Sequence, residues 1–269
     1  WGGMGQLLTA NGYCFDLVND DMLQHRYAAE GNQLRLGAMT YRVLILPDVS
    51  ALPLETFRHI EAFVRQGGSV IALERVPEAS TGMRDYALND AEVRRISADL
   101  FAEPVGRNGV GLKSCGQGRT WHMRLVMHRS DQLDWRSAPL DPFLRALRQS
   151  VPPDMDIDLV GAGLRNNEGL TFTHRRTGQA DIYFVANMQE LPIDQRVGFR
   201  VTEGQPYWWD AFTGECTPIL EYKRDGEYAR VRLAMEPYES RLVVFESAAE
   251  ATEPVHVAQS DFAEIQRAE

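Results

Sequence analysis

The stretch Val43-Leu44-Ile45-Leu46, followed by Leu54 to Gln66 and then by Val70-Ile71-Ala72-Leu73, decides the fold of the first half of the chain. Apolar runs without alternation are typical of strands that are covered on both faces, as in parallel sheets. The segment between them predicts a helix, because Pro53 suits its first turn and Gly67-Gly68 ends it. Four apolar residues share one face of this helix: Phe57, Ile60, Phe63 and Val64.

The same alternation of strands and helices extends over residues 1–150. The patterns predict strands at Tyr13 to Val18 and at Arg119 to Val126. They also predict three helices: one from Asp20 or Asp21 toward Ala29, one that follows a capping box formed by Asn89 and Glu92, and one at Asp141 to Gln149. Such alternation implies right-handed crossovers between parallel strands. We therefore expect an α/β domain at residues 1–150 with an amidotransferase-like or flavodoxin-like parallel sheet.

The pattern changes at Pro152-Pro153, where we place the domain boundary. Residues 151–247 carry short alternating or β-branched segments, which predict an all-β sandwich. Asp225-Gly226 lies between two of these segments and is the strongest hairpin signal in the chain. Residues 248–269 form a polar tail.

Composition excludes several classes of function. The 269 residues are 44% hydrophobic and 25% charged, which is ordinary for a globular protein, and the net charge is −10. An acidic chain is a poor partner for nucleic acid, and no apolar run reaches the roughly 20 residues that cross a membrane. The start at Trp1-Gly2-Gly3 has no signal-peptide pattern, and we expect the chain to begin inside a longer protein.

Catalytic and metal-binding candidates are weak. Cys115 lies among glycines without a nucleophile-elbow frame, so we expect it to be inert, and we expect all three cysteines, Cys14, Cys115 and Cys216, to be unpaired. The six histidines have no recognised ligand spacing, so we predict neither a metal nor another cofactor. The carboxylates Glu74, Asp210 and Glu215 are not paired by spacing as a glycosidase would require. We therefore assign no catalytic residue.

Tyr207-Trp208-Trp209 is the densest aromatic cluster. Aromatic faces stack on sugars, so Trp208 and Trp209 are candidate carbohydrate-binding residues, with core packing as the alternative. Neighbouring residues on a strand point to opposite faces. We expect Trp209 to be the tryptophan that packs in the core and Trp208 to face outward.

Several segments in order resemble one family. They are Tyr41 to Pro47, Phe63 to Ala72, Ala180 to Asn187, Trp209 to Glu215 and Glu239 to Phe245. Together they resemble the C-terminal region of the α-L-rhamnosidases of glycoside hydrolase family 106 and their relatives. The resemblance covers most of residues 13 to 247.

The resemblance implies a non-catalytic accessory region of a bacterial glycoside hydrolase. In that family the catalytic carboxylates and a calcium ion belong to an N-terminal barrel, so no catalytic residue carries over to this chain. The implied partner is the barrel of the same parent chain, with carbohydrate as a further candidate, and a periplasmic or secreted parent is compatible with it. Two alternatives stay open: a self-standing amidotransferase-like or α/β-hydrolase enzyme, and a carbohydrate-binding module.

Overall fold

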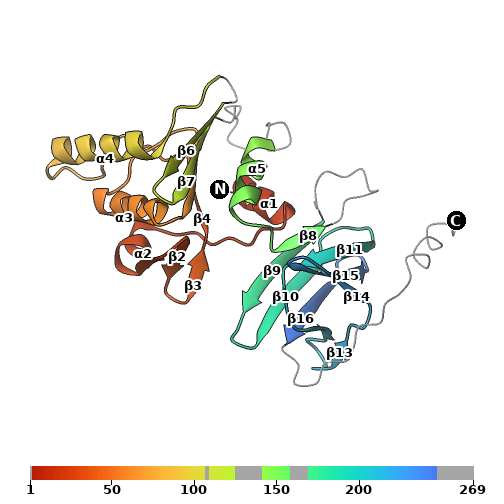
Figure 1. Ribbon diagram of the computed structural model, residues 1–269. Coiled ribbons are helices and arrows are strands. Elements are labelled where there is room, and N and C mark those ends of the chain that lie inside the picture. Colours follow the sequence, from red (N-terminus) through yellow and green to blue (C-terminus); the bar gives the residue numbers. More distant parts are fainter. Residues whose placement is uncertain (1, 107–108, 125–140, 158–168, 247–269) are drawn as a thin grey trace. The chain divides into compact units, whose positions relative to one another are not determined.

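The chain folds as two compact units. The computed structural model describes residues 2–106, 109–124, 141–157 and 169–246 (Figure 1). One unit comprises Asp16–Pro152, and the other comprises Trp1–Phe15 together with Pro153–Glu269. We call them the mixed-sheet unit and the antiparallel unit, after their main sheets.

A four-stranded sheet is the centre of the mixed-sheet unit. Its strands β4 (Val43–Pro47), β5 (Ser69–Leu73) and β7 (Gly118–Met123) pair in parallel. The last strand in the order β4-β5-β7-β6 is β6 (Val110–Cys115), which forms an antiparallel pair with β7. The sheet is therefore mixed, with three parallel strands and one antiparallel edge strand.

Helices lie on both faces of this sheet (Figure 1). On one face, α3 (Leu54–Arg65) and α4 (Tyr86–Leu100) pack against each other, and their apolar residues share a core cluster with Val70 and Ala72 of β5. On the other face lies α5 (Asp141–Ser150), which buries Phe143, Ala146 and Leu147. The apolar stripe that predicts α3 is confirmed, since its members are fully or almost fully buried.

A short helix and a small sheet precede this layer. Helix α2 (Asp20–His25) begins after Asn19, whose side chain accepts a hydrogen bond from the Met22 N–H. Strands β1 (Tyr27–Glu30), β2 (Gln33–Leu36) and β3 (Met39–Tyr41) then form an antiparallel sheet.

The antiparallel unit contains helix α1 (Gly2–Ala10) and two sheets. One sheet has the order β13-β12-β16-β10-β9, with β9 (Leu170–Arg176), β10 (Ala180–Asn187), β12 (Gln205–Trp209), β13 (Cys216–Pro218) and β16 (Ser240–Glu246). The other has the order β14-β15-β11-β8, with β8 (Met155–Ile157), β11 (Ile193–Phe199), β14 (Tyr222–Asp225) and β15 (Tyr228–Met235). Alternate residues of both sheets contribute to one buried apolar cluster.

The hairpin predicted around Asp225-Gly226 is confirmed, but its two loop residues are Gly226 and Glu227, because Asp225 still belongs to β14. Strands β14 and β15 pair in an antiparallel register that puts Asp225 opposite Tyr228. Gly226 takes a φ of 58°, which a residue without a Cβ adopts at little cost. A two-residue turn of this kind keeps the strand twist continuous.

The expected fold class is wrong. We expected an amidotransferase-like or flavodoxin-like parallel sheet followed by a β-sandwich, but the described residues form five helices and four mixed or antiparallel sheets. Only three strands pair in parallel, and β6 returns to β7 through a hairpin with no crossover helix. The apolar runs of β4 and β5 do pair in parallel, but they carry no information about the direction of the more distant strand β6.

Several predictions for individual strands and helices are also wrong. Tyr13 to Val18 is not a strand, and the helix expected to reach Ala29 ends at His25. Asn89 lies inside α4, which begins after Asp85, and its side-chain amide donates to the Arg84 carbonyl at 3.0 Å. Among the described helices, none is long and apolar enough to span a membrane.

Candidate functional site

The two candidate tryptophans lie on β12 and point to opposite faces of its sheet. Trp208 is aligned with the buried Val243 of β16 and packs against the core cluster of the antiparallel unit. The guanidinium of Arg241 lies 5.2 Å from the centre of the Trp208 ring. The expectation that Trp209 is the core residue is therefore wrong by one position in register. Two indoles on opposite faces cannot form one continuous platform for a sugar.

The cysteines and candidate carboxylates do not assemble into a catalytic group. None of the three cysteines forms a disulfide, and burial raises the pKa of the Cys115 thiol at the end of β6, which disfavours the nucleophilic thiolate. Glu74 follows β5 in the mixed-sheet unit, whereas Asp210 and Glu215 belong to one turn of the antiparallel unit. Asp210 forms that turn by accepting hydrogen bonds from the N–H groups of Phe212 and Thr213.

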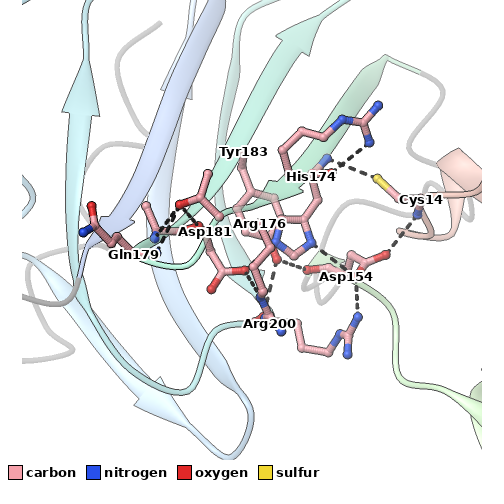
Figure 2. A network of polar contacts seen from close by, with 11 residues as sticks. Cys14, Asp154, His174, Arg176, Gln179, Asp181, Tyr183 and Arg200 are labelled. Atoms are coloured by element: carbon pink, nitrogen blue, oxygen red, sulfur yellow. Dashed lines mark hydrogen bonds and ion pairs between the residues drawn. The ribbon is translucent and has the colours of Figure 1, made fainter. Parts of the chain in front are cut away.

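A densely connected group of polar side chains lies in the antiparallel unit (Figure 2). It joins five parts of the chain: Cys14 after α1, Asp154 before β8, His174 and Arg176 on β9, Asp181 and Tyr183 on β10, and Arg200 after β11. The register of β9 and β10 places Tyr183 opposite His174 and Asp181 opposite Arg176. We call this group the His174 network.

Asp154 is the centre of one half of the network. Its carboxylate accepts a hydrogen bond from the Cys14 N–H at 3.0 Å and pairs with the Arg200 guanidinium. Its backbone carbonyl accepts from the Tyr183 hydroxyl at 3.1 Å and from the Arg200 N–H at 2.9 Å. Asp154 therefore fixes the segment after α1, the start of β8 and the end of β11 to one another.

His174 links Asp154 to the other half. Its Nε2 lies 2.7 Å from Asp181 Oδ1, and its Nδ1 lies 3.5 Å from Asp154 Oδ1. The imidazole stacks on Tyr183 with ring centres 4.1 Å apart and an interplanar angle of 8°. Its backbone N–H donates to the Cys14 sulfur at 3.2 Å, and Arg176 donates to Asp181 at 2.7 Å. Each ring nitrogen therefore faces a carboxylate.

The electrostatics favour the charged forms of His174, Asp154 and Asp181. Burial lowers the pKa of His174, but hydrogen bonds and attraction to Asp154 and Asp181 outweigh it, so that its pKa is raised. Burial raises the pKa of Asp154, yet the bonds to His174 and Arg200 outweigh this effect and leave the pKa lowered. Asp181 has a lowered pKa for the same reasons, with Arg176 as its arginine partner.

This arrangement is suited to holding the fold together and poorly suited to catalysis. A general acid or base must present a proton or a lone pair to a substrate, and both nitrogens of His174 are already directed at carboxylates. Its side chain is 11% exposed, and those of Asp154 and Asp181 are 13% and 16% exposed. Within the described ranges, no three His, Cys, Asp or Glu side chains come close enough to hold a metal ion.

Sequence reasoning missed the His174 network. Its members are separated by as many as 186 residues, from Cys14 to Arg200, and only the tertiary fold brings them together. The alternation of His174 and Arg176 on one strand was the single local signal, and it does not identify the acidic partners.

Comparisons with known proteins agree on a class. A family model for α-L-rhamnosidases, glycoside hydrolase family 106, matches residues 6–224. A protein from Formosa agariphila named "Putative beta-glucuronidase" is 28% identical over 240 residues, which are 88% of this chain and 17% of that protein. The structure of a rhamnosidase from Novosphingobium sp. PP1Y is 27% identical with a TM-score of 0.64, over 90% of this chain and 20% of that chain.

Both relatives carry the names of glycosidases, which is the class of protein to which the fold points. The chain belongs to the α-L-rhamnosidase family, glycoside hydrolase family 106. It spans about a fifth of the length of the relatives it matches, 17% of one and 20% of the other.

Proposed function

We propose that this chain is a non-catalytic accessory region of a bacterial glycoside hydrolase of the α-L-rhamnosidase family. Its task is to support a catalytic barrel that another part of the same protein provides. The observation that carries the proposal is the overlap with the Novosphingobium rhamnosidase, which includes 90% of this chain but only 20% of that enzyme. Nearly the whole chain thus corresponds to one portion of a much larger glycosidase.

The ionisation of the carboxylates supports the same proposal. A glycosidase needs a carboxylic acid whose pKa is raised, so that it can protonate the leaving oxygen. Among the described residues, every carboxylate with a clearly shifted pKa has it lowered. These residues are Asp48, Glu92, Asp154, Asp181, Asp194, Asp210, Asp225 and Glu239.

A domain exchange tests the supporting role. Removal of the matching region from the Novosphingobium rhamnosidase should abolish its soluble expression or its activity, and insertion of this chain in that place should restore both. An unrelated domain of similar length is the control and should restore neither. Full activity of the truncated enzyme would contradict the proposal.

We propose that Trp209, and not Trp208, is the residue of the aromatic cluster that contacts carbohydrate. Trp209 lies on the sheet face away from the core cluster, whereas Trp208 packs against that cluster. Titration with L-rhamnose should then change the indole fluorescence of the wild type and of the Trp208→Phe variant. The fluorescence of the Trp209→Phe variant should not change. The same response in Trp209→Phe would exclude this contact.

A further inference from the structure

A polar cavity of about 220 Å³, open to solvent, lies at the surface of the mixed-sheet unit, at the edge where β5 and β7 begin. Its walls come from the turn between β1 and β2, the residue before β4, the starts of β5 and β7, and the last turn of α5. The side chains that matter for recognition are two arginines, three amides and two serines: Arg42, Arg119, Asn32, Gln117, Gln149, Ser69 and Ser150.

The cavity is cationic in an acidic chain. Arg42 and Arg119 line it, no Asp or Glu does, and the net charge of the whole chain is −10. Within the described residues neither arginine has an ion-pair partner, whereas Arg65 and Arg75 of the same unit pair with Glu61 and Asp48. Two guanidinium groups without a carboxylate are suited to an external anion.

The two arginines border the same cavity from either side of β5, since Arg42 directly precedes β4 and Arg119 lies on β7. The register aligns Val43, Ser69 and Arg119, so Arg42 lies one residue before this row. The Ser69 N–H donates to the Arg42 carbonyl at 3.3 Å. Neighbouring strands are about 4.8 Å apart, so the Cα atoms of Arg42 and Arg119 lie roughly 10 Å apart across β5. Side chains as long as arginine can converge from that distance on a single carboxylate.

The remaining lining suits hydroxyl groups. Amides and hydroxyls both donate and accept hydrogen bonds. The last turn of α5 borders the cavity with Gln149 and Ser150, and the last carbonyls of a helix lack intrahelical partners and carry partial negative charge. Such carbonyls accept hydrogen bonds from hydroxyls but oppose a bare inorganic anion. A volume of about 220 Å³ is below the usual range for drug-sized ligands and fits a single sugar ring.

We propose that this cavity binds a sugar acid of monosaccharide size. Arg42 and Arg119 hold its carboxylate, and the amide and serine side chains hold its ring hydroxyls. The inference goes beyond the accessory role, which requires no small ligand, and it holds or fails independently of that role.

Calorimetric titration of the full chain with D-glucuronate, D-glucose and acetate at one ionic strength tests the proposal. Glucuronate should bind and should bind more tightly than either of the other two ligands. Arg42→Gln and Arg119→Gln should each weaken glucuronate binding about tenfold or more, because each removes a charge-assisted hydrogen bond. Arg58→Gln changes an exposed arginine of α3 outside the cavity and should leave the affinity unchanged.

Three results would overturn the proposal. Glucuronate could fail to bind, acetate could bind as tightly as glucuronate, or both cavity variants could keep the wild-type affinity. Thermal melts of the three variants, compared with the wild type, show that each is folded before its affinity is interpreted.

Discussion

His174 lies between two mostly buried carboxylates that favour its protonated form, and its titration therefore affects stability. The folded pKa of His174 is raised, because pairing with Asp154 and Asp181 outweighs burial. A raised histidine pKa contributes stability that is fully present below the unfolded pKa and is lost as the pH rises through the folded pKa. The unfolded pKa is about 6.5, so we expect the free energy of unfolding to fall as the pH rises above about 6.5.

Replacement of His174 by Gln should remove this dependence. At about pH 6 the variant should lose roughly 3 kcal/mol, because Asp154 and Asp181 stay buried without their shared partner. Urea unfolding at several pH values measures both effects. His25→Gln is the matched control, since His25 pairs with Asp21 in solvent, with side chains 68% and 73% exposed. An unchanged pH slope in His174→Gln would show that His174 is not the titrating group.

We predict that replacement of Trp208 and replacement of Trp209 have unequal effects on stability. Trp208→Ala should destabilise the chain by about 3 kcal/mol, because it removes packing against the core cluster and the contact with Arg241. Trp209→Ala should cost clearly less. Thermal melts of the two variants measure the difference, and an equal or larger loss at Trp209 would contradict the register described here.

Sequence patterns predict residue environments only in part. The alternation of a strand implies that adjacent tryptophans point to opposite faces, but a slip of one residue exchanges the faces, and here the chosen register was wrong. The His174 network could not be predicted from the sequence for another reason. Cys14 and His174 are 160 residues apart, and no local pattern records that their backbones meet.

At the scale of elements, the end of α3 and the start of β7 are packed with almost no space between them. A Cβ atom on Gly118 would lie 2.0 Å from the Val64 carbonyl oxygen and 2.3 Å from that of Gly68. Gly118→Ala should therefore force backbone movement and destabilise the chain by roughly 1–3 kcal/mol. Gly178→Ala is the control, because nothing lies within 4 Å of its added methyl group. The denaturant midpoints of the two variants measure the difference, and equal shifts in Gly118→Ala and Gly178→Ala would contradict this close packing.

Helices were easier to predict than sheets. The stripe in α3 and the span of α5 follow from a 3.6-residue period within one segment, and both match the structure. Sheet topology depends on which strands become neighbours. Nothing local at Val110–Cys115 indicates that this strand returns antiparallel to β7, and the fold-class prediction failed at that point.

At the scale of the molecule, residues 1–15 belong to the same unit as the C-terminal half. Cys14 contacts Asp154 and His174 across 140 and 160 residues of sequence. Composition could not reveal this connection, since it describes neither order nor contact. The family was accessible from the sequence, because the order of several short segments carries more information than any one of them.

The measurement that tests the central claim most directly is the hydrolysis of an aryl α-L-rhamnoside by the purified chain. The account predicts no release of the aryl group above the uncatalysed rate, because the described carboxylates with shifted pKa values are held in their ionised form. The intact Novosphingobium rhamnosidase, assayed in parallel, establishes that the substrate is competent. Saturable turnover by this chain, abolished by replacement of one of its own carboxylates, would contradict a non-catalytic accessory role.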